Sequence, residues 1–533
     1  MKRLLWVLAL SFTWPALAAD DHDHGTAAGR PPETLGKVSF PTSCEPPVQA
    51  QFERGVALLH SFWFAEGLKA FTAVAEQDPA CGMAHWGIAI NRLLNPFNGE
   101  AAPDFVKQGQ AAIDKARAVG AKTQRERDYI DAAALLYTDL GTRRWPERAV
   151  AYERAMARLV EKYPADVEAK VFYALALNFA ANLNDQTYAK PLQAAQILEP
   201  LLIAHPEHPG IAHFLIHSYD YPALAEKGLA AARRYASIAP SAAHALHMPS
   251  HIFTRIGAWE DSVATNRRSE DTARAESSGD EALHAIDYQV YAYLQVARDG
   301  DAKQAIERGD DYASRFTFSR PPGPFGQSAA SARYALERGD WKSAAQLPAK
   351  PTKIPYATAN LHFARALGAA RSRNPAAAKA DIARLAELRD ELAAAKNAYW
   401  AGQVDIQWQS AAAWAALAEG RRDEALTLMR AAADKESASE KAPISPGPIL
   451  PARELLGDML LELGQPALAL REYEASQRRE PNRFRGWYGA ATAAAKSGDA
   501  AKAKTYYGKL AALAPQGESR PELREARQYL AVR

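Results

Sequence analysis

The 533-residue sequence lacks the charge imbalance that marks many nucleic-acid-binding proteins. It holds 64 Lys and Arg residues against 62 Asp and Glu residues, a formal net charge of +2. Lys2 and Arg3 belong to an N-terminal segment with the pattern of a cleaved leader, and without them the two signs are equal in number. Since no basic excess is present to attract a phosphate backbone, no nucleic-acid partner is expected.

Common catalytic motifs are also missing. The sequence contains no Gly-rich phosphate loop, no GxSxG nucleophile turn, no HExxH helix and no CxxC pair. No apolar stretch of membrane-spanning length follows the N-terminal segment, so we expect no transmembrane anchor. A chain of this length exceeds one compact core, and its 48 % hydrophobic and 24 % charged residues indicate a soluble helical protein. No catalytic residue is predicted, and whether the protein is an enzyme stays open.

Residues 1–18 have the composition of a secretory signal peptide. Lys2 and Arg3 precede an apolar run, and Ala16-Leu17-Ala18 forms a small-residue cleavage site. A buried first helix is the alternative, but it is disfavoured because the polar stretch DDHDHG follows directly. We therefore expect a periplasmic or secreted mature protein.

Cysteine is scarce, with only Cys44 and Cys81 in the whole sequence. In an oxidising compartment a disulfide between them is expected, tying the N-terminal arm to the first repeat. A metal role is the alternative, since Cys81 and His85 lie four residues apart. Residues 19–45 are rich in Asp, His, Pro and Gly, which indicates a flexible arm.

A 34-residue period runs through the chain. Pro206 and Pro240 are 34 residues apart, as are Pro481 and Pro515. Small and aromatic residues precede these prolines at places typical of the tetratricopeptide (TPR) repeat, a helix–turn–helix unit that the segments resemble. Because one unit cannot bury its apolar face alone, we expect an all-α fold, a right-handed α-solenoid of TPR-like helical hairpins in two arrays.

Three proline-rich breaks, at residues 319–328, 347–356 and 441–451, interrupt this pattern. Such breaks can fold over a groove, although an ordinary connector is the commoner role. The expected organisation is a signal peptide (1–18), a flexible arm (19–45), an N-terminal TPR array with a histidine-lined groove (46–315), a proline-rich break and hairpin (316–356), helical hairpins (357–440) and C-terminal TPR repeats (441–533).

Histidines concentrate in one region, with seven of the 13 between residues 208 and 284. His213 and His217 lie four residues apart, and His247 and His251 repeat this spacing 34 residues later. Residues four apart share a helix face, and residues one repeat apart take equivalent places on neighbouring units. In TPR folds these first-helix positions line the concave groove, so the resemblance places four imidazoles on one groove wall.

This wall is a candidate site for zinc, copper or iron, because neutral imidazole is a common ligand of all three. Asp220 lies three residues after His217, so its carboxylate can reach that imidazole or the same ion. His244 is expected as a further ligand or as a support of the ligands. Pro249 should start or kink a helix within the second pair.

Other residues near this wall are candidates for ligand binding. Arg255 lies four residues after His251 and could bind an anionic substrate or pair with Asp220. His208 and His284 are further candidates, and Glu281 and Asp287 could add ligands from the next helix.

Two functions without a metal remain open for the same groove. One is a TPR scaffold that binds a peptide or protein partner, and the other is a pH-sensitive packing cluster. His60, His85 and His362 stand outside the spacing pattern, and we expect structural roles for them.

One part of the chain resembles a narrower group than the general repeat. ILEPLLIAHPEHPGIAHFLIHSYDYPALA through AHALHMPSHIFTRIGAWEDSV is similar to exported bacterial TPR proteins with an HPGxAHxxIHxxD and HxxHMPSHIF pattern. LLHSFWFAEGLKAF through DPACGMAHWGIAI resembles the same group. The resemblance covers roughly residues 44–300 and implies the fold and the location of a site, but no activity.

Overall fold

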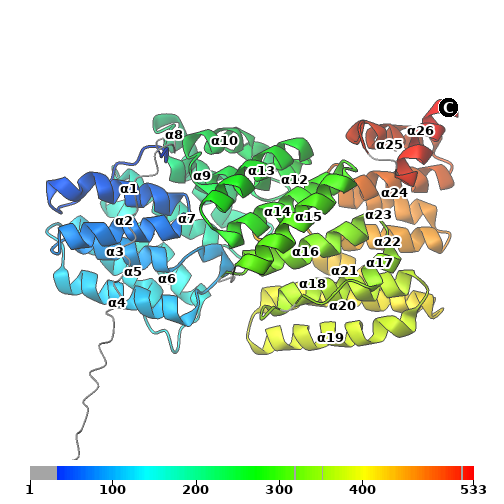
Figure 1. Ribbon diagram of the computed structural model, residues 1–533, viewed down its shortest axis with the longest axis horizontal. Helices are drawn as coiled ribbons and strands as arrows, with labels where there is room; N and C mark the ends of the chain where they lie inside the picture. Colours follow the sequence, from blue (N-terminus) through cyan, green and yellow to red (C-terminus); the bar gives the residue numbers. More distant parts are fainter. Residues whose placement is uncertain (1–32, 317–319, 351, 518–519, 533) are drawn as a thin grey trace, which may run out of the picture. The chain divides into compact units, whose positions relative to one another are not determined.

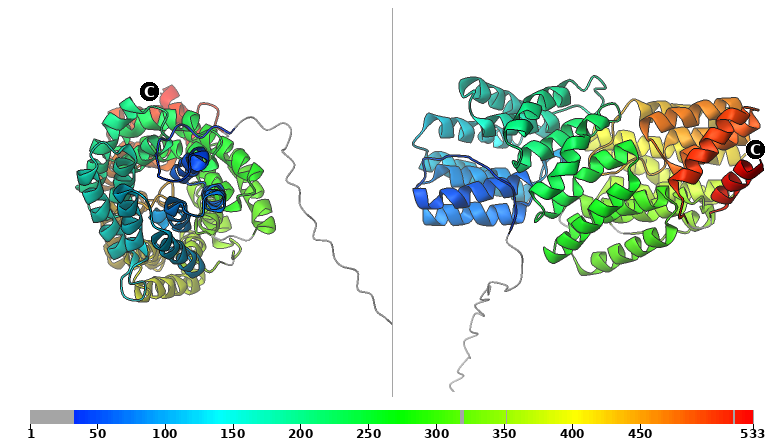
Figure 2. Two further views of the ribbon diagram at one scale, coloured as in Figure 1. Left: turned by 90° about the vertical axis from the view of Figure 1, so that its left-hand side faces the viewer. Right: turned by 90° about the horizontal axis from the view of Figure 1, so that it is seen from above.

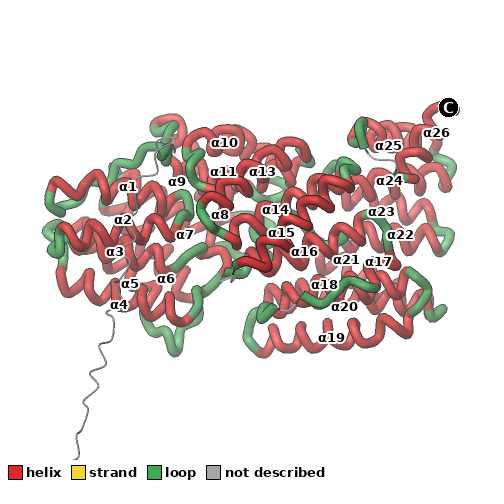
Figure 3. The backbone as a smooth tube through the Cα atoms, viewed as in Figure 1, coloured by secondary structure: helices red, strands yellow, loops and turns green. Residues whose placement is uncertain are grey.

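The computed structural model describes residues 33–533 apart from 317–319, 351, 518–519 and 533. The expected signal peptide and most of the expected arm lie outside the described residues. Residues 34–533 form one unit, whose helices lie side by side along the chain (Figure 1). Within the described ranges every regular element is a helix and no strand occurs (Figure 3). None of the described helices combines the length and apolar character that a membrane crossing requires.

The first helices of the described chain run from a 3-10 helix to the helix that carries His284. They are η1 (Pro46–Val48), α1 (Gln49–His60), α2 (Phe64–Gln77), α3 (Gly82–Arg92), η2 (Pro96–Asn98), α4 (Pro103–Val119), α5 (Gln124–Ala134), η3 (Leu135–Tyr137), α6 (Trp145–Lys162), α7 (Val167–Phe179), α8 (Ala189–Ala204), α9 (Pro209–Tyr219), α10 (Ala225–Ile238), α11 (Ala243–His247), α12 (Pro249–Ile256), α13 (Trp259–Ala275) and α14 (Gly279–Gln295).

The other described helices follow in order to the end of the chain. They are α15 (Asp299–Arg315), α16 (Pro322–Glu337), α17 (Trp341–Ala345), α18 (Pro355–Arg371), α19 (Pro375–Ala394), α20 (Ala398–Ala418), α21 (Arg422–Ser437), α22 (Ala452–Glu462), α23 (Pro466–Arg479), α24 (Phe484–Lys496), α25 (Ala500–Leu513) and α26 (Pro521–Val532).

The hairpin of α24 and α25 shows how the sequence forms the repeat unit. Gly498 has φ 85°, a left-handed conformation that suits glycine at the end of a helix. The Asp499 side chain then accepts a hydrogen bond from the Lys502 amide (3.0 Å) and starts the next helix. The two helices pack against each other across this short turn.

Close contacts between glycine and an aromatic ring hold neighbouring hairpins together at both ends of the chain. A methyl group on Gly87 would lie 2.3 Å from the Phe71 ring, and one on Gly489 would lie 2.2 Å from the Tyr473 ring. Both rings are buried, so each glycine provides the room that an aromatic side chain fills. With the all-helical order, this packing is that of an α-solenoid of TPR-like hairpins, the fold expected from the sequence.

Residues 34–45 differ from the flexible arm expected there. Phe40 is fully buried, with its ring centroid 5.5 Å from that of Phe52, and the Lys37 amide donates to the Glu207 carbonyl (2.9 Å). Cys44 forms a disulfide with Cys81, the pairing expected from the sequence. These contacts hold the segment against α1, the turn before α3 and the turn between α8 and α9, and its deep-blue trace runs beside the helices (Figure 2).

The C-terminal helices pack against α13 and α14. The Trp259 indole N–H donates to the Asn482 carbonyl (2.8 Å), and the Phe484 amide donates to the Gln295 side chain (3.0 Å). Helix α24 accordingly contacts α14. The helix that carries His284 is therefore packed between two parts of the chain that are far apart in sequence.

Candidate metal centre

Six histidines from four helices meet in the interior of the protein. We call them the six-histidine cluster; α9 supplies two, α11 and α12 together supply three, and α14 supplies one: His213, His217, His244, His247, His251 and His284. All six are between 0 and 6 % exposed. The resemblance to TPR repeats predicts that these histidines line a concave groove and leaves open whether other segments cover it. In the structure, aromatic rings and a later segment of the chain enclose them.

The second histidine pair lies where one helix ends and another begins. Helix α11 ends at His247 and α12 starts at Pro249, as the proline predicts. Despite this break, the Nε2 atoms of His247 and His251 lie 3.0 Å apart. The four-residue spacing thus brings the rings together across the helix junction.

Hydrogen bonds fix which nitrogen of each ring in this pair carries its proton. The Nδ1 atom of His251 lies 2.9 Å from an Asp220 carboxylate oxygen, which can only accept. The Nδ1 atom of His247 lies 2.6 Å from Asn266 Oδ1, and the Asn266 amide nitrogen is oriented by donating to the Ser262 carbonyl (2.8 Å). Both Nδ1 atoms are therefore donors, and the neutral rings present bare Nε2 lone pairs to each other.

The first pair is held in a similar way. His213 Nδ1 donates to the backbone carbonyl of His60 (2.6 Å), so its Nε2 lone pair faces His217 Nε2 at 3.1 Å. His244 lies beside them, with its Nδ1 3.4 Å from the Glu281 carboxylate. The other nitrogen of His244 is buried and makes no hydrogen bond to the described residues.

These contacts divide the cluster into two groups of three. One group is His213, His217 and His244, and the other is His247, His251 and His284; within each, one ring nitrogen per residue lies within 4.8 Å of the other two. We call them triad 1 and triad 2. His284 joins the second through its ring, whose centroid lies 4.3 Å from that of His247.

The environment favours the neutral form of five of these imidazoles. Burial, with the neighbouring imidazoles adding to it, holds the pKa of His213, His217 and His247 well below the ordinary value of 6.5. Burial also lowers the pKa of His251 to about 4, although Asp220 opposes it, and that of His284 to about 3. Neutral imidazole is the form that binds metal ions.

Asp220 supports a histidine instead of facing the cluster as a ligand. Its carboxylate contacts His251 Nδ1, Arg255 Nε (2.9 Å) and Lys441 Nζ (2.9 Å). Burial alone would raise the pKa of Asp220, but Lys441 and Arg255 outweigh burial and lower it. The expected contact with His217 is replaced by one with His251, and Arg255 is only 2 % exposed and paired with Asp220, so it does not present its charge to a substrate.

Aromatic rings enclose triad 1. Phe62 has φ 53°, a left-handed conformation that costs a bulky residue of order 1–3 kcal/mol. In this conformation its ring stacks on His244 (5.2 Å between centroids) and meets His213 edge-on (4.5 Å). Phe97 stacks on His217 at 4.0 Å. The strained residue thus lies at the cluster and helps exclude water from it.

The last of the three proline-rich breaks closes the cluster on another side. We call residues 438–451, between α21 and α22, the cover segment. Lys441 of this segment pairs with Asp220, and the Tyr288 hydroxyl lies 3.1 Å from both the Pro443 and Ser445 carbonyls. The same hydroxyl is 3.5 Å from His251 Nε2. This break therefore takes the less common of the two expected roles and folds over the histidines.

The cover segment is held by hydrogen bonds to two parts of the chain that are far apart in sequence. The buried guanidinium of Arg333 donates to the Gly447 carbonyl (2.8 Å) and the Pro448 carbonyl (2.5 Å). At its other end the Glu440 amide donates to the Leu183 carbonyl (2.9 Å). Hydrogen bonds from α16 and from the turn after α7 hold the segment in place.

A third buried group lies next to triad 1. One carboxylate oxygen of Glu168 lies 2.8 Å from His60 Nε2, and the other lies 2.7 Å from His208 Nε2. Burial alone would raise the pKa of Glu168, but His208 and His60 outweigh it and lower the pKa to about 2. His208 Nδ1 also accepts the Ile211 amide (3.3 Å) at the start of α9. His208, expected as a ligand-binding residue, thus caps a helix and pairs with a carboxylate.

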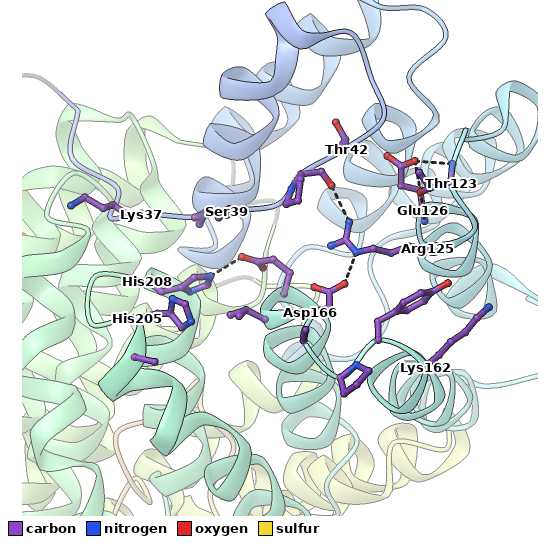
Figure 4. A pocket seen from close by; sticks show the side chains of 18 of the residues that line it. Lys37, Ser39, Thr42, Thr123, Arg125, Glu126, Lys162, Asp166, His205 and His208 are labelled. Carbon is purple, nitrogen blue, oxygen red and sulfur yellow. Dashed lines mark hydrogen bonds and ion pairs between the residues drawn. The ribbon is translucent and has the colours of Figure 1, made fainter.

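Glu168 and His208 also form part of the wall of a cavity of about 1090 Å³. Figure 4 shows its polar lining, which includes Arg125 bonded to Asp166 (2.6 Å). Lys162 on the same wall pairs with an aspartate outside it. Since its charged groups are already paired, the cavity offers no concentrated charge to a ligand.

Among the described histidines outside the cluster, His60 and His362 make structural contacts, and both cysteines are in the disulfide. His362 pairs with Asp381 (2.7 Å) and His85 is half-buried on α3, as expected for residues outside the pattern. His60 makes a buried ion pair with Glu168 while its carbonyl orients His213. The alternative of a metal at Cys81 is excluded here because its sulfur is in the disulfide.

Several supporting residues carried no signal in the sequence. Asn266 lies in α13 among many similar polar residues, Glu168 lies in the first turn of α7, and Phe62 lies in the turn after α1. Lys441 belonged to a recognised break, yet its partner Asp220 is 221 residues away. Only the repeat spacing of the ligands themselves is visible without the fold.

Comparison with known proteins gives no relative with an assigned activity. No family model and no curated protein matches the sequence. Among solved structures, a human IFIT1 dimer with m7Gppp-AAAA is similar at 12 % identity and a TM-score of 0.37, over 81 % of this chain and 90 % of that chain. A tetratricopeptide repeat protein from Parabacteroides merdae is similar at 13 % identity and a TM-score of 0.30, over 55 % and 99 %. Such distant likenesses carry nothing about the cluster.

Proposed function

We propose that this chain is an exported TPR-like protein whose six-histidine cluster binds a transition metal, zinc, copper or iron, for metal handling or metal-dependent chemistry. The observation that carries the proposal is the 3.0 Å contact between His247 Nε2 and His251 Nε2. Each neutral ring carries its one proton on Nδ1 and donates it there. Neither Nε2 atom then has a proton, so no hydrogen bond can form between the two. Two lone pairs at this distance need a cation between them.

A metal ion meets that need with suitable geometry. Nitrogens bound at 2.0–2.1 Å to one ion lie about 2.9–3.4 Å apart for bond angles between 90° and tetrahedral. The separations of 3.0 Å in one pair and 3.1 Å in the other fall in this range. Ligating histidines usually donate their second nitrogen to a carboxylate or carbonyl, as His251 and His213 do here. A shared proton is the other candidate, but burial disfavours the charged imidazolium.

Peptide binding in the manner of an open TPR groove is less well supported at this place. The candidate contact residues are at most 6 % exposed, and the cover segment lies over them. Export is supported by the signal-peptide pattern of residues 1–18 and by the disulfide, which suits an oxidising compartment.

The test is the metal content of protein purified without an affinity tag. We expect zinc, copper or iron at near-stoichiometric level, with loss of the metal in His213→Ala plus His247→Ala and no loss in the control His85→Ala plus His362→Ala. A wild-type protein that neither contains nor takes up any of the three metals would refute the proposal. A second test is a pulldown with added chelator, since partner binding that survives chelation would favour a scaffold.

A further inference from the structure

We infer that the six-histidine cluster holds two metal ions, one in each triad, which form a binuclear centre. The inference rests on the proposed function and goes beyond it in the number, arrangement and class of the ions. Each triad offers three ring nitrogens within 4.8 Å of one another, enough to surround one ion. Three imidazoles with one open position are a common donor set in catalytic sites.

Ring positions separate the triads while keeping them adjacent. Within the triads, neighbouring rings lie 4.9 Å apart for His213 and His217 and 5.0 Å for His247 and His251, measured between centroids. The two pairs are farther from each other, 5.9 Å from His217 to His251, and His284 lies nearer to His247 (4.3 Å) than to His251 (6.5 Å). One ion cannot reach both Nε2 pairs equally, whereas two ions can each take one pair.

Each triad also has its own set of supporting acceptors. In triad 1 the His60 carbonyl holds His213, and Glu281 lies at His244 Nδ1. In triad 2 the supports are Asn266 and Asp220. Acceptors of this kind set the ring tautomer and orientation of metal ligands. The four acceptors are thus divided equally, two for each triad.

The donor set indicates which metals fit. All six candidate ligands are imidazoles, and the nearby carboxylates are already paired, Asp220 with Arg255 and Lys441 and Glu281 with Arg320. Magnesium, calcium and manganese prefer oxygen ligands, and non-haem iron sites commonly include a carboxylate. An all-imidazole set suits copper or zinc. Two such ions, each with an open position in one enclosure, could act together on one small molecule.

The closing experiment counts ions and assigns them to triads. The tagless apoprotein is loaded with Zn(II) or with Cu(II), freed of excess metal and analysed by mass spectrometry for metal per chain. We expect two equivalents in the wild type and one in each of two variants, His213→Ala plus His244→Ala and His247→Ala plus His284→Ala. The control His85→Ala plus His362→Ala should keep two.

Electron paramagnetic resonance of the copper-loaded proteins gives an independent readout. Two adjacent Cu(II) ions should couple and lose the signal of isolated copper, and each single-triad variant should restore it. One equivalent in the wild type would overturn the binuclear centre and leave the proposed function standing. No metal in the wild type would overturn both. The wild-type count does not depend on the folding of any variant.

Discussion

The sharpest prediction concerns Asn266, which touches one ligand and is not itself a ligand. Its Oδ1 accepts the Nδ1–H of His247 at 2.6 Å, and both residues are at most 1 % exposed. In Asn266→Ala that N–H loses its acceptor, and a buried unsatisfied N–H costs about 1–3 kcal/mol. The ring can avoid this cost by moving its proton to Nε2, where it donates to His251 Nε2 across the existing 3.0 Å contact.

That new hydrogen bond stabilises the metal-free protein by about 0.5–1.5 kcal/mol, and the proton on His247 Nε2 leaves that nitrogen without a lone pair for the ion. We therefore expect Asn266→Ala to weaken metal binding roughly 10- to 100-fold, the range typical for residues that support a ligand. This corresponds to about 1.4–2.8 kcal/mol. Asn266→Asp keeps an acceptor at the same place, so its metal affinity should equal or exceed that of the wild type.

The assay is a competition titration of zinc against a chromogenic chelator at neutral pH. Asn360→Ala is a matched control, because Asn360 is an equally buried amide that bonds Ser328 and not an imidazole (3.1 Å). It should leave the affinity unchanged. If Asn266→Ala binds zinc within about threefold of the wild type, or if Asn266→Asp is equally damaging, the tautomer argument is wrong.

Three further predictions concern the stability of the fold. Replacing both cysteines with alanine should lower the free energy of unfolding by about 3–4 kcal/mol, since the disulfide closes a separation of 37 residues; urea denaturation would measure it. Arg483→Met should lower the free energy of unfolding by about 3–5 kcal/mol in the same assay, because it leaves Glu337 and Glu454 buried without their cation. An unchanged denaturation midpoint would contradict that pairing. Burial raises the pKa of Glu436 from 4.5 to about 7, so the folded state holds this proton more tightly than the unfolded chain. The free energy of unfolding should therefore fall as the pH rises from about 4.5 to about 7, and Glu436→Gln should flatten the slope.

The repeat pattern predicted the helical hairpins because the contacts that form them are local. The 34-residue spacing of Pro206 and Pro240 matches the starts of α9 and of α11 closely. Pairs such as Gly489 and Tyr473 lie in adjacent helices, so one period of sequence is enough to infer them.

The same spacing found the members of the cluster but not their surroundings. It assigned His213, His217, His247 and His251 to equivalent positions, and the structure brings all four together. It left open whether the groove is covered, because a single repeat says nothing about the position of later segments. Burial here depends on residues 438–451, which reach the cluster through contacts that no periodicity encodes.

Hydrogen-bond partners were the least predictable part. Asp220 lies three residues from His217 in sequence, yet its carboxylate turns to His251 and Lys441. The choice follows from the end of α9 at Tyr219, which places Asp220 outside the helix. A three-residue spacing predicts a contact only where the helix continues through both residues.

The cover segment bears on the order in which the protein is assembled. Most helices pack on their immediate neighbours and can form as soon as those neighbours exist, whereas the Lys441–Asp220 pair joins residues 221 positions apart. Contacts of such long separation form late in folding. The histidines therefore meet while their enclosure is still open, and the chain must be complete through residue 451 before it closes. If the cluster binds metal as proposed, the ion has to enter before residues 438–451 dock over the histidines.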